Sequence, residues 1–197
     1  MNISDIKKEF PIFSYKVQNN DLVYLDSANS AQKPKIVIDR IYDFYTKEFS
    51  NVGRSVHYLA VAATNLYETT RTSVQKYINA KDKNEIVFTK GATEAINLIA
   101  NTFGQKYLSE GDEVLLTELE HHSNYVPWHF LRKAKNIKIE FAEINEDGEI
   151  TLDSIEKKIT NKTKIISVTH LSNVTGAILP IKEIIKLAHS KDIPVLI

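Results

Sequence analysis

The chain has 197 residues, of which 43% are hydrophobic and 25% are charged, the proportions of a globular domain with a core of its own. Lys+Arg and Asp+Glu both number 25, so the formal charge is zero, and neither nucleic acid nor a membrane is indicated as partner. No apolar run approaches the roughly 20 residues that span a bilayer, and the first residues lack the apolar segment of a secretory signal. The absence of cysteine excludes disulfides and thiolate metal sites in this chain and fits a cytoplasmic protein.

Along the chain, short apolar runs alternate with segments in which apolar residues recur at helical spacing, which predicts alternating strands and helices. Short apolar runs predict strands at residues 22–25, 86–88, 114–116, 137–141, 165–168 and 193–197. Helical spacing predicts helices at residues 34–49, 59–78, 92–103, 125–134, 152–159 and 180–188. This alternation is typical of an α/β fold with a mainly parallel sheet. Residues 1–21 are expected to form an N-terminal arm, and residues 22–197 part of one large domain.

The last residues, Ile193–Ile197, have the pattern of a buried strand that the chain leaves unfinished. A natural terminus there would expose an apolar strand without a partner. We therefore expect the chain to be a fragment that is truncated in the middle of its sheet.

The segment Thr89–Glu94 leads from a predicted strand directly into a helix. Gly91 allows the backbone to approach a ligand, and the first turn of a helix offers free N–H groups and the positive end of its dipole. Together with the Thr93 hydroxyl, this segment could hold a phosphate group. The alternative is an ordinary N-cap, in which Thr93 serves only its own helix. A P-loop motif and a G-x-G-x-x-G fingerprint are both missing, which disfavours an ATPase or a NAD-dependent dehydrogenase.

Two adjacent histidines, His121 and His122, follow the predicted strand at residues 114–116. Ligands of parallel α/β sheets bind outside the carboxyl ends of the strands. Neighbouring side chains of an extended segment point to opposite sides, so we expect one imidazole to face a site. That ring could stack on a flat heteroaromatic ligand or move a proton near neutral pH. The alternative is a pair of partly exposed loop histidines. No metal site is predicted, because the histidines show no ligand spacing.

A third polar segment, Thr169–Gly176, follows the predicted strand at residues 165–168. The carboxamide of Asn173 can donate and accept hydrogen bonds, which suits a phenolic oxygen or a carboxylate. The alternative is turn chemistry, since Asn and Ser favour turns near Gly. No segment alone is decisive, but three such segments at strand ends of one parallel sheet favour a binding site.

Four segments of the chain together form a recognisable pattern. They are Leu25–Pro34, Lys90–Leu98, Glu120–Trp128 and Thr169–Gly176. In their order and spacing they resemble the class V aminotransferase family, and more narrowly the Suf-type, or group II, cysteine desulfurases. The resemblance implies the three-layer α/β fold of the large domain of fold-type I enzymes, which use pyridoxal 5′-phosphate (PLP). Residues 22–197 would then be part of a PLP-binding large domain.

The resemblance also implies an activity. It predicts a homodimeric transferase that takes sulfur from L-cysteine, leaves L-alanine and an enzyme persulfide, and supplies a sulfur-acceptor protein of iron–sulfur cluster assembly. The Ala92 backbone and Thr93 would hold the PLP phosphate. His121 would lie on the pyridine ring and help to move protons, while His122 supports the loop.

The remaining site residues are assigned by the same resemblance. Asn173 would contact the 3′-oxygen of the ring or the carboxylate of the substrate, and Ala28 and Asn29 would lie beside the substrate. The aspartate that pairs with the pyridine nitrogen, the Schiff-base lysine, the sulfur-accepting cysteine and the carboxylate-binding arginine would all lie beyond residue 197. We therefore expect this chain alone to be inactive and to hold no stable covalent PLP.

The sequence departs from the family pattern at several positions. The usual Asn-x-His-Arg-Gly-x-His is replaced by the segment Asn51–His57, with Gly53 and Ser55 in place of the first histidine and the glycine. Asn29 stands where alanine is usual, and Ala92 where threonine is frequent. These departures leave the identity of the substrate more open than the binding of the cofactor.

Three alternatives to a desulfurase remain. Another class V enzyme, such as a selenocysteine lyase or an aminotransferase, is the nearest, because the distinguishing residues lie beyond residue 197. A non-catalytic α/β binding module is disfavoured by the unfinished last strand. A Rossmann-type nucleotide binder is disfavoured by the missing glycine fingerprint.

Overall fold

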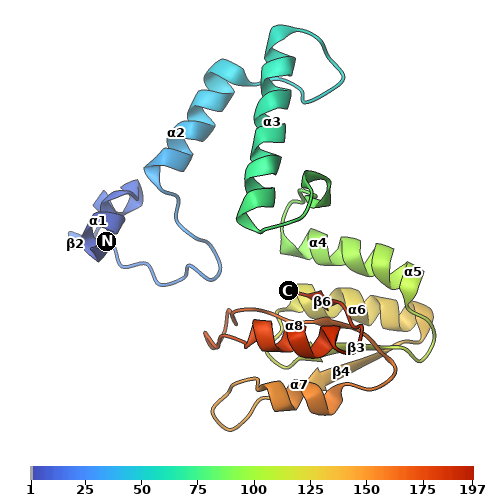
Figure 1. The fold of residues 1–197 in the computed structure, drawn as a ribbon. Helices are drawn as coiled ribbons and strands as arrows, with labels where there is room; N and C mark the ends of the chain where they lie inside the picture. Colours follow the sequence, from blue (N-terminus) through green and yellow to red (C-terminus); the bar gives the residue numbers. More distant parts are fainter. Residues whose placement is uncertain (1) are drawn as a thin grey trace. The chain divides into compact units, whose positions relative to one another are not determined.

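The computed structural model of the chain describes residues 2–197. These residues form two compact units, and the boundary between them lies between Phe88 and Thr89. Figure 1 draws the first unit in blue to green and the second in yellow-green to red. The segment predicted to be an arm, residues 2–21, belongs to the first unit. None of the helices within the described residues is both long and apolar enough to cross a membrane.

The first unit is mainly helical. Its elements are α1 (Ile3–Lys8), η1 (Pro11–Ser14), β1 (Lys16–Val17), β2 (Asn20–Asp21), α2 (Lys35–Asp43), η2 (Phe44–Glu48), α3 (Tyr58–Tyr77) and η3 (Lys83–Glu85). The strands β1 and β2 form a small antiparallel hairpin that the sequence did not predict. Gln18 and Asn19 form its turn with φ of 51° and 66°, the positive values that a tight two-residue hairpin turn requires.

Two predicted strands, residues 22–25 and 86–88, are wrong. Neither segment joins a sheet within residues 2–197. A strand exists only where a neighbouring strand takes up its backbone N–H and C=O groups, and here no such neighbour is present. Arg71 of α3 instead donates to the carbonyl of Ile86 and to the Tyr67 hydroxyl, the latter at 3.1 Å. Its guanidinium also lies 5.3 Å from the ring centroid of Phe88, so the segment is held by a side chain.

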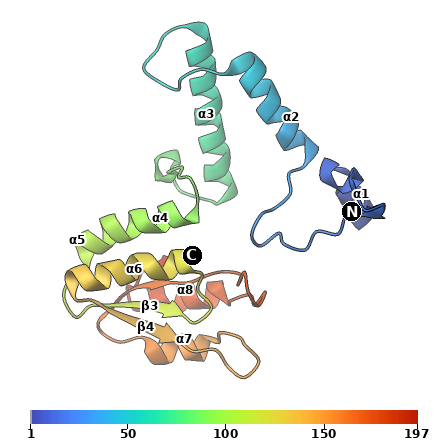
Figure 2. The same cartoon turned by 180° about the vertical axis from the view of Figure 1, so that it is seen from behind.

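The second unit contains a four-stranded parallel sheet. Its elements are α4 (Ala92–Ile99), η4 (Ala100–Gly104), α5 (Gln105–Tyr107), β3 (Glu113–Thr117), α6 (His122–Lys135), β4 (Lys138–Ala142), α7 (Leu152–Lys158), β5 (Thr163–Ser167), α8 (Ile181–His189) and β6 (Val195–Leu196). The strand order is β4-β3-β5-β6, and every neighbouring pair is parallel. The four later strand predictions and the helices between them are thereby confirmed. Figure 2 shows the same unit from behind.

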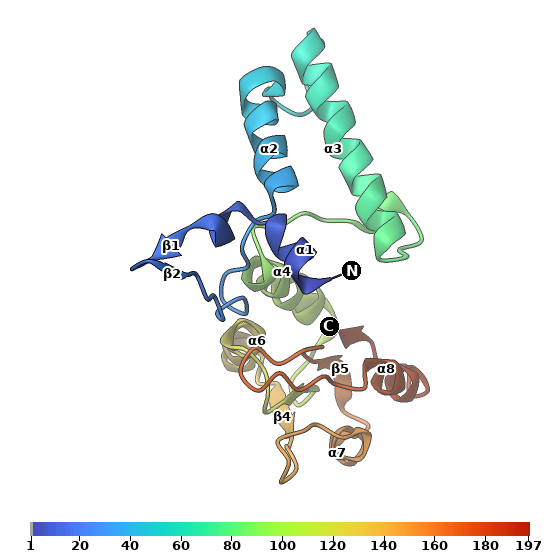
Figure 3. The same ribbon diagram turned by 90° about the vertical axis from the view of Figure 1, so that its left-hand side faces the viewer.

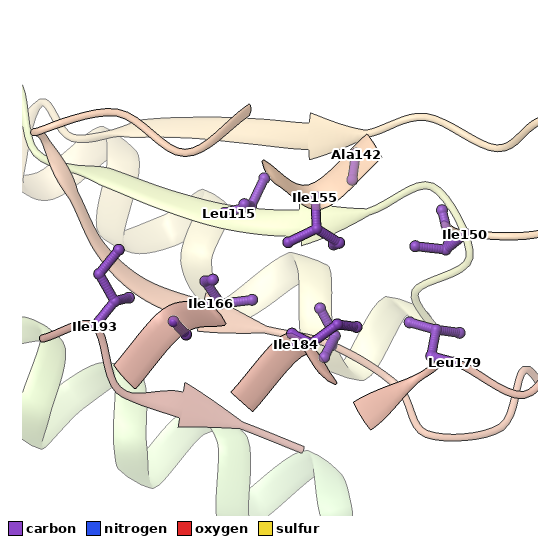
Figure 4. Close-up of a cluster of buried hydrophobic side chains, with 10 residues drawn as sticks. Leu115, Ala142, Ile150, Ile155, Ile166, Leu179, Ile184 and Ile193 are labelled. Atoms are coloured by element: carbon purple, nitrogen blue, oxygen red, sulfur yellow. The ribbon is translucent and has the colours of Figure 1, made fainter. Parts of the chain in front are cut away.

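The sheet lies between two layers of helices. Successive side chains of a strand point to opposite faces. Leu115 of β3 therefore packs in the cluster that contains Ile155 of α7 and Ile184 of α8 (Figure 4). Its neighbour Val114 packs in a second cluster on the other face, with Trp128 of α6. Figure 3 shows α7 and α8 on one side of the strands and α6 on the other. The three-layer α/β prediction is confirmed.

Candidate active site

Two of the three predicted polar segments follow adjacent strands. Strands β3 and β5 pair in parallel, so their carboxyl ends lie at the same edge of the sheet. Glu118–His121 follows β3 and is called here the β3 tip; Thr169–Gly176 follows β5 and is called the β5 tip. The third segment, Thr89–Glu94, opens helix α4 as predicted, but it does not follow a strand, because residues 86–88 form none.

The carboxylate of Glu120 connects the two tips. Its Oε1 accepts a hydrogen bond from the Thr117 hydroxyl at 2.6 Å and from the backbone N–H of Thr169 at 3.0 Å. Its Oε2 accepts from Nδ2 of Asn124 at 2.7 Å. The donors thus come from β3, from α6 and from the β5 tip. A carboxylate offers about four acceptor positions, and three are used here by neutral donors.

The carboxamide of Asn124 completes this network and is buried. Besides Glu120, its Nδ2 donates to the carbonyl of Ser167 at 3.1 Å. Its Oδ1 accepts from the Ser167 hydroxyl at 2.5 Å and from the Trp128 indole N–H at 3.2 Å. An amide has two donor and two acceptor positions, and all four are occupied. The orientation of this amide is therefore determined by its partners. Glu120, Asn124 and Ser167 are called the clamp below.

His121 lies at the exposed end of the clamp, next to Glu120. It is the N-cap residue of α6, where its Nδ1 accepts the backbone N–H of Ser123 at 3.1 Å and lies 2.9 Å from the Ser123 hydroxyl. A backbone N–H can only donate, so Nδ1 must be the acceptor. A neutral ring then carries its proton on Nε2, which is the nitrogen left for a ligand.

His122 is the first residue of α6 and is also exposed. Its ring lies edge-on to that of His121, with centroids 6.0 Å apart and an interplanar angle of 79°. Within residues 2–197 its ring forms no hydrogen bond, so the contact that supports the start of α6 is made by His121. The separate roles predicted for the two histidines stay predictions.

Asn173 lies exposed in the β5 tip, which is a compact turn. The buried hydroxyl of Ser172 accepts the backbone N–H groups of Val174 and Thr175, both at 3.3 Å. The N–H of Gly176 donates to the Ser172 carbonyl at 3.0 Å, and the positive φ of 76° at Gly176 closes the turn. The Asn173 side chain forms no hydrogen bond within the described residues. Its amide is therefore available to a ligand.

Comparison with known proteins identifies the family. The family model of the class-V aminotransferases matches residues 23–197. The chain belongs to the class-V aminotransferase family. The family and the fold that the sequence resemblance predicted are thereby confirmed.

Curated relatives of this class-V aminotransferase carry desulfurase names. A probable cysteine desulfurase of Halalkalibacterium halodurans is 45% identical over 189 residues, which are 96% of this chain and 47% of that protein. A cysteine desulfurase of Synechococcus elongatus is 41% identical over 196 residues, which are 100% of this chain and 31% of that protein. The chain therefore spans about half, or less, of the length of the curated relatives it matches.

Solved structures give the same result. An apo cysteine desulfurase from Thermococcus onnurineus matches with a TM-score of 0.88 and 34% identity, over 99% of this chain and 47% of that chain. The cysteine desulfurase CsdA from Escherichia coli matches with a TM-score of 0.83 and 33% identity, over 99% of this chain and 48% of that one. Class-V aminotransferases and the desulfurases among them are PLP-dependent enzymes, so PLP is the cofactor of this family.

The residues at the start of α4 fit a phosphate group such as that of PLP. Ala92 and Thr93 are exposed, and within residues 2–197 their backbone N–H groups and the Thr93 hydroxyl have no acceptor. A side chain placed on Gly91 would meet no atom within 4 Å outside its chain neighbours, so no other segment crowds the residue that precedes these N–H groups. The exposed, oriented ring of His121 and the exposed amide of Asn173 suit a flat ring with a phenolic oxygen. The chemistry of these groups therefore agrees with the cofactor.

Ala28 and Asn29 belong to the first unit, and their proposed place beside the substrate stays a prediction. They lie in an exposed turn, where Asn29 Nδ2 donates to the Asp26 carboxylate at 3.3 Å. Sequence reasoning missed the roles of Glu120, Asn124 and Ser167. One signal was present, since Ser167 is a polar residue inside the apolar run at residues 165–168. Its partner Asn124 could not be recognised, because it lies 43 residues away in the chain.

Proposed function

We propose that this chain is part of a PLP-dependent cysteine desulfurase. The observation that carries the proposal is the β3 tip, where His121 is exposed at the carboxyl edge of the sheet with its Nδ1 engaged and its Nε2 available. Proteins named cysteine desulfurase that align with 96% or more of this chain support it. A further solved relative, SspA in complex with cysteine, is 27% identical and supports L-cysteine as the substrate.

The residues of this chain would divide the work as follows. Ala92, through its backbone N–H, and Thr93 bind the phosphate at the positive end of the α4 dipole. Asn173 binds the 3′-oxygen of the ring or the substrate carboxylate. His121 covers the ring and transfers protons through Nε2, while its Nδ1 contact with Ser123 holds the plane of the imidazole. When bound, PLP supplies the electron sink for the reaction.

The proposal includes the activity of the whole enzyme. L-Cysteine gives up its sulfur, L-alanine leaves, and a persulfide on the enzyme passes the sulfur to an acceptor protein of iron–sulfur cluster assembly. A homodimer, a cytoplasmic location, Ala28 and Asn29 beside the substrate, and inactivity of this chain by itself belong to the same proposal. Each rests on the resemblance to Suf-type enzymes.

The proposal is tested by comparing His121→Ala with His122→Ala in a complete enzyme that contains these residues. Loss of a positioned proton-transfer group lowers kcat for alanine formation roughly 10²- to 10⁴-fold, so His121→Ala is expected to fall in this range. His122→Ala is the matched control and is expected to change kcat less than about threefold, since removal of an exposed side chain with no acid–base role leaves the barrier nearly unchanged. The absorbance of bound PLP serves to show that both variants keep the cofactor.

Equal losses in the two variants would refute the assignment of His121. Release of alanine from selenocysteine but not from cysteine would instead identify another class V enzyme.

A further inference from the structure

The clamp joins two parts of the site that are far apart in the chain. Glu120 accepts from Thr117 at the end of β3, from Asn124 in α6 and from the backbone of Thr169 in the β5 tip. Thr169 lies 49 residues after Glu120. A single carboxylate therefore ties the turn that presents His121 to the segment that presents Asn173.

The clamp admits only one arrangement of donors and acceptors. The Trp128 indole N–H can only donate, so its bond fixes Oδ1 of Asn124 on that side, where Oδ1 also accepts the Ser167 hydroxyl. The Nδ2 group must then face the Ser167 carbonyl and Glu120. Glu120 in turn must present acceptors in both directions, because the Thr169 N–H and Asn124 Nδ2 are both donors. Only a carboxylate meets this requirement.

We propose that Glu120 is a positioning residue, whose carboxylate sets the place of His121 relative to the β5 tip. The inference rests on the proposed function of His121 and goes beyond it, because it assigns a role to a carboxylate whose three hydrogen bonds are all made within the chain. Its side chain is partly buried beneath the tip, and its acceptors are used within the protein. A displacement of about 1 Å in a catalytic group lowers turnover on the order of 10²-fold, so such a positioning contact affects the rate.

Glu120→Gln is the sharpest perturbation, since it keeps size and shape. The glutamine has one acceptor oxygen, which can accept from either the Thr169 N–H or Asn124 Nδ2. Its NH₂ group then faces the other donor, so no hydrogen bond forms there. Glu118→Gln is the matched control. Glu118 lies in the same β3 tip, is exposed, and accepts one backbone N–H, that of Ile144 at 3.0 Å, which a glutamine oxygen also accepts.

Two measurements on the complete holoenzyme test separately whether the hydrogen bonds of the clamp exist and whether they affect catalysis. The first is hydrogen exchange of a peptide that covers Thr169. Glu120→Ala is expected to speed exchange at this amide at least tenfold, and Glu118→Ala to leave it unchanged, because only the Glu120 side chain accepts that N–H. The second is steady-state kinetics, in which Glu120→Gln should lower kcat about 10- to 100-fold with KM changed less than about threefold.

A second variant tests whether the donor–acceptor match is the cause. Adding Asn124→Asp to Glu120→Gln restores a donor facing an acceptor between the two side chains, so part of the lost kcat should return, although the Ser167 carbonyl then loses its donor. Unchanged exchange at Thr169 in Glu120→Ala overturns the clamp, whatever the function of His121. Faster exchange in Glu120→Ala with a kcat equal to that of Glu118→Ala overturns the positioning role. Neither result alters the comparison of His121→Ala with His122→Ala, which tests the proposed function separately.

Discussion

The buried amide of Asn124 provides the most demanding test of the structure. Asn124→Asp changes one NH₂ group into an oxygen and leaves the volume of the side chain almost unchanged. In the structure Nδ2 lies 2.7 Å from Oε2 of Glu120 and 3.1 Å from the Ser167 carbonyl. The variant therefore places a carboxylate oxygen against two acceptors.

The magnitude follows from the first of these distances. Two unit charges 2.7 Å apart repel by about 6 kcal/mol at an effective dielectric constant of about 20. The folded variant avoids this energy by binding a proton between the two carboxyls. It then holds one more proton than the unfolded chain, so its stability falls as the pH rises, by about 1.4 kcal/mol per pH unit above pH ~4. The protonated pair still lacks the hydrogen bond to the Ser167 carbonyl, and this missing bond lowers the unfolding free energy by about 1–2 kcal/mol at every pH.

The assay is denaturant unfolding of the wild-type chain and the variant between pH 4 and pH 7. The expected loss of unfolding free energy is about 1–2 kcal/mol at pH 4 and grows to about 4–6 kcal/mol toward pH 7. Asn161→Asp is the matched control, because Asn161 is exposed in the turn before β5. It should change stability by less than about 0.5 kcal/mol, with no pH slope.

A loss that is the same at pH 4 and at pH 7 would refute the reasoning, since the carboxyl pair would then not share a proton. A loss below about 1 kcal/mol at pH 7 would show that Asn124 does not make the bonds described.

Two further predictions concern the core and the surface. Ile184→Ala removes a side chain that is 0% exposed and should lower the unfolding free energy by about 2–5 kcal/mol in urea, whereas Ile178→Ala, at a side chain 72% exposed, should lower it by less than about 0.5 kcal/mol; equal effects would contradict the packing of α8. Lys158 Nζ donates to the Glu143 carboxylate at 2.7 Å and holds its pKa below the usual 4.5. Because the folded pKa is the lower one, this pair adds stability above pH 4.5 that is lost as the pH falls through the folded pKa. Lys158→Met should move the Glu143 pKa toward 4.5 in an NMR titration, and an unmoved titration would contradict the ion pair.

The local spacing of apolar residues was sufficient to predict most strands and helices of the second unit. The apolar run at residues 114–116 and the alternation at residues 137–141 predicted β3 and β4, because side-chain period follows directly from backbone geometry. The same pattern failed at residues 22–25 and 86–88, which have the composition of strands and no strand beside them. A strand forms only when a second strand takes up its backbone hydrogen bonds, and the residues of the first strand do not specify that partner.

The sequence by itself determined which chemical groups stand at the ends of β3 and β5, since motif and strand are adjacent in the chain. It named His121 and Asn173 as candidates, and it predicted the family through the order of four segments. Only the tertiary structure decided that Glu120 joins the two tips, because its bond to Thr169 spans 49 residues. Contacts between segments so far apart in the chain arise when strands pair, so the spacing of residues within one segment does not predict them.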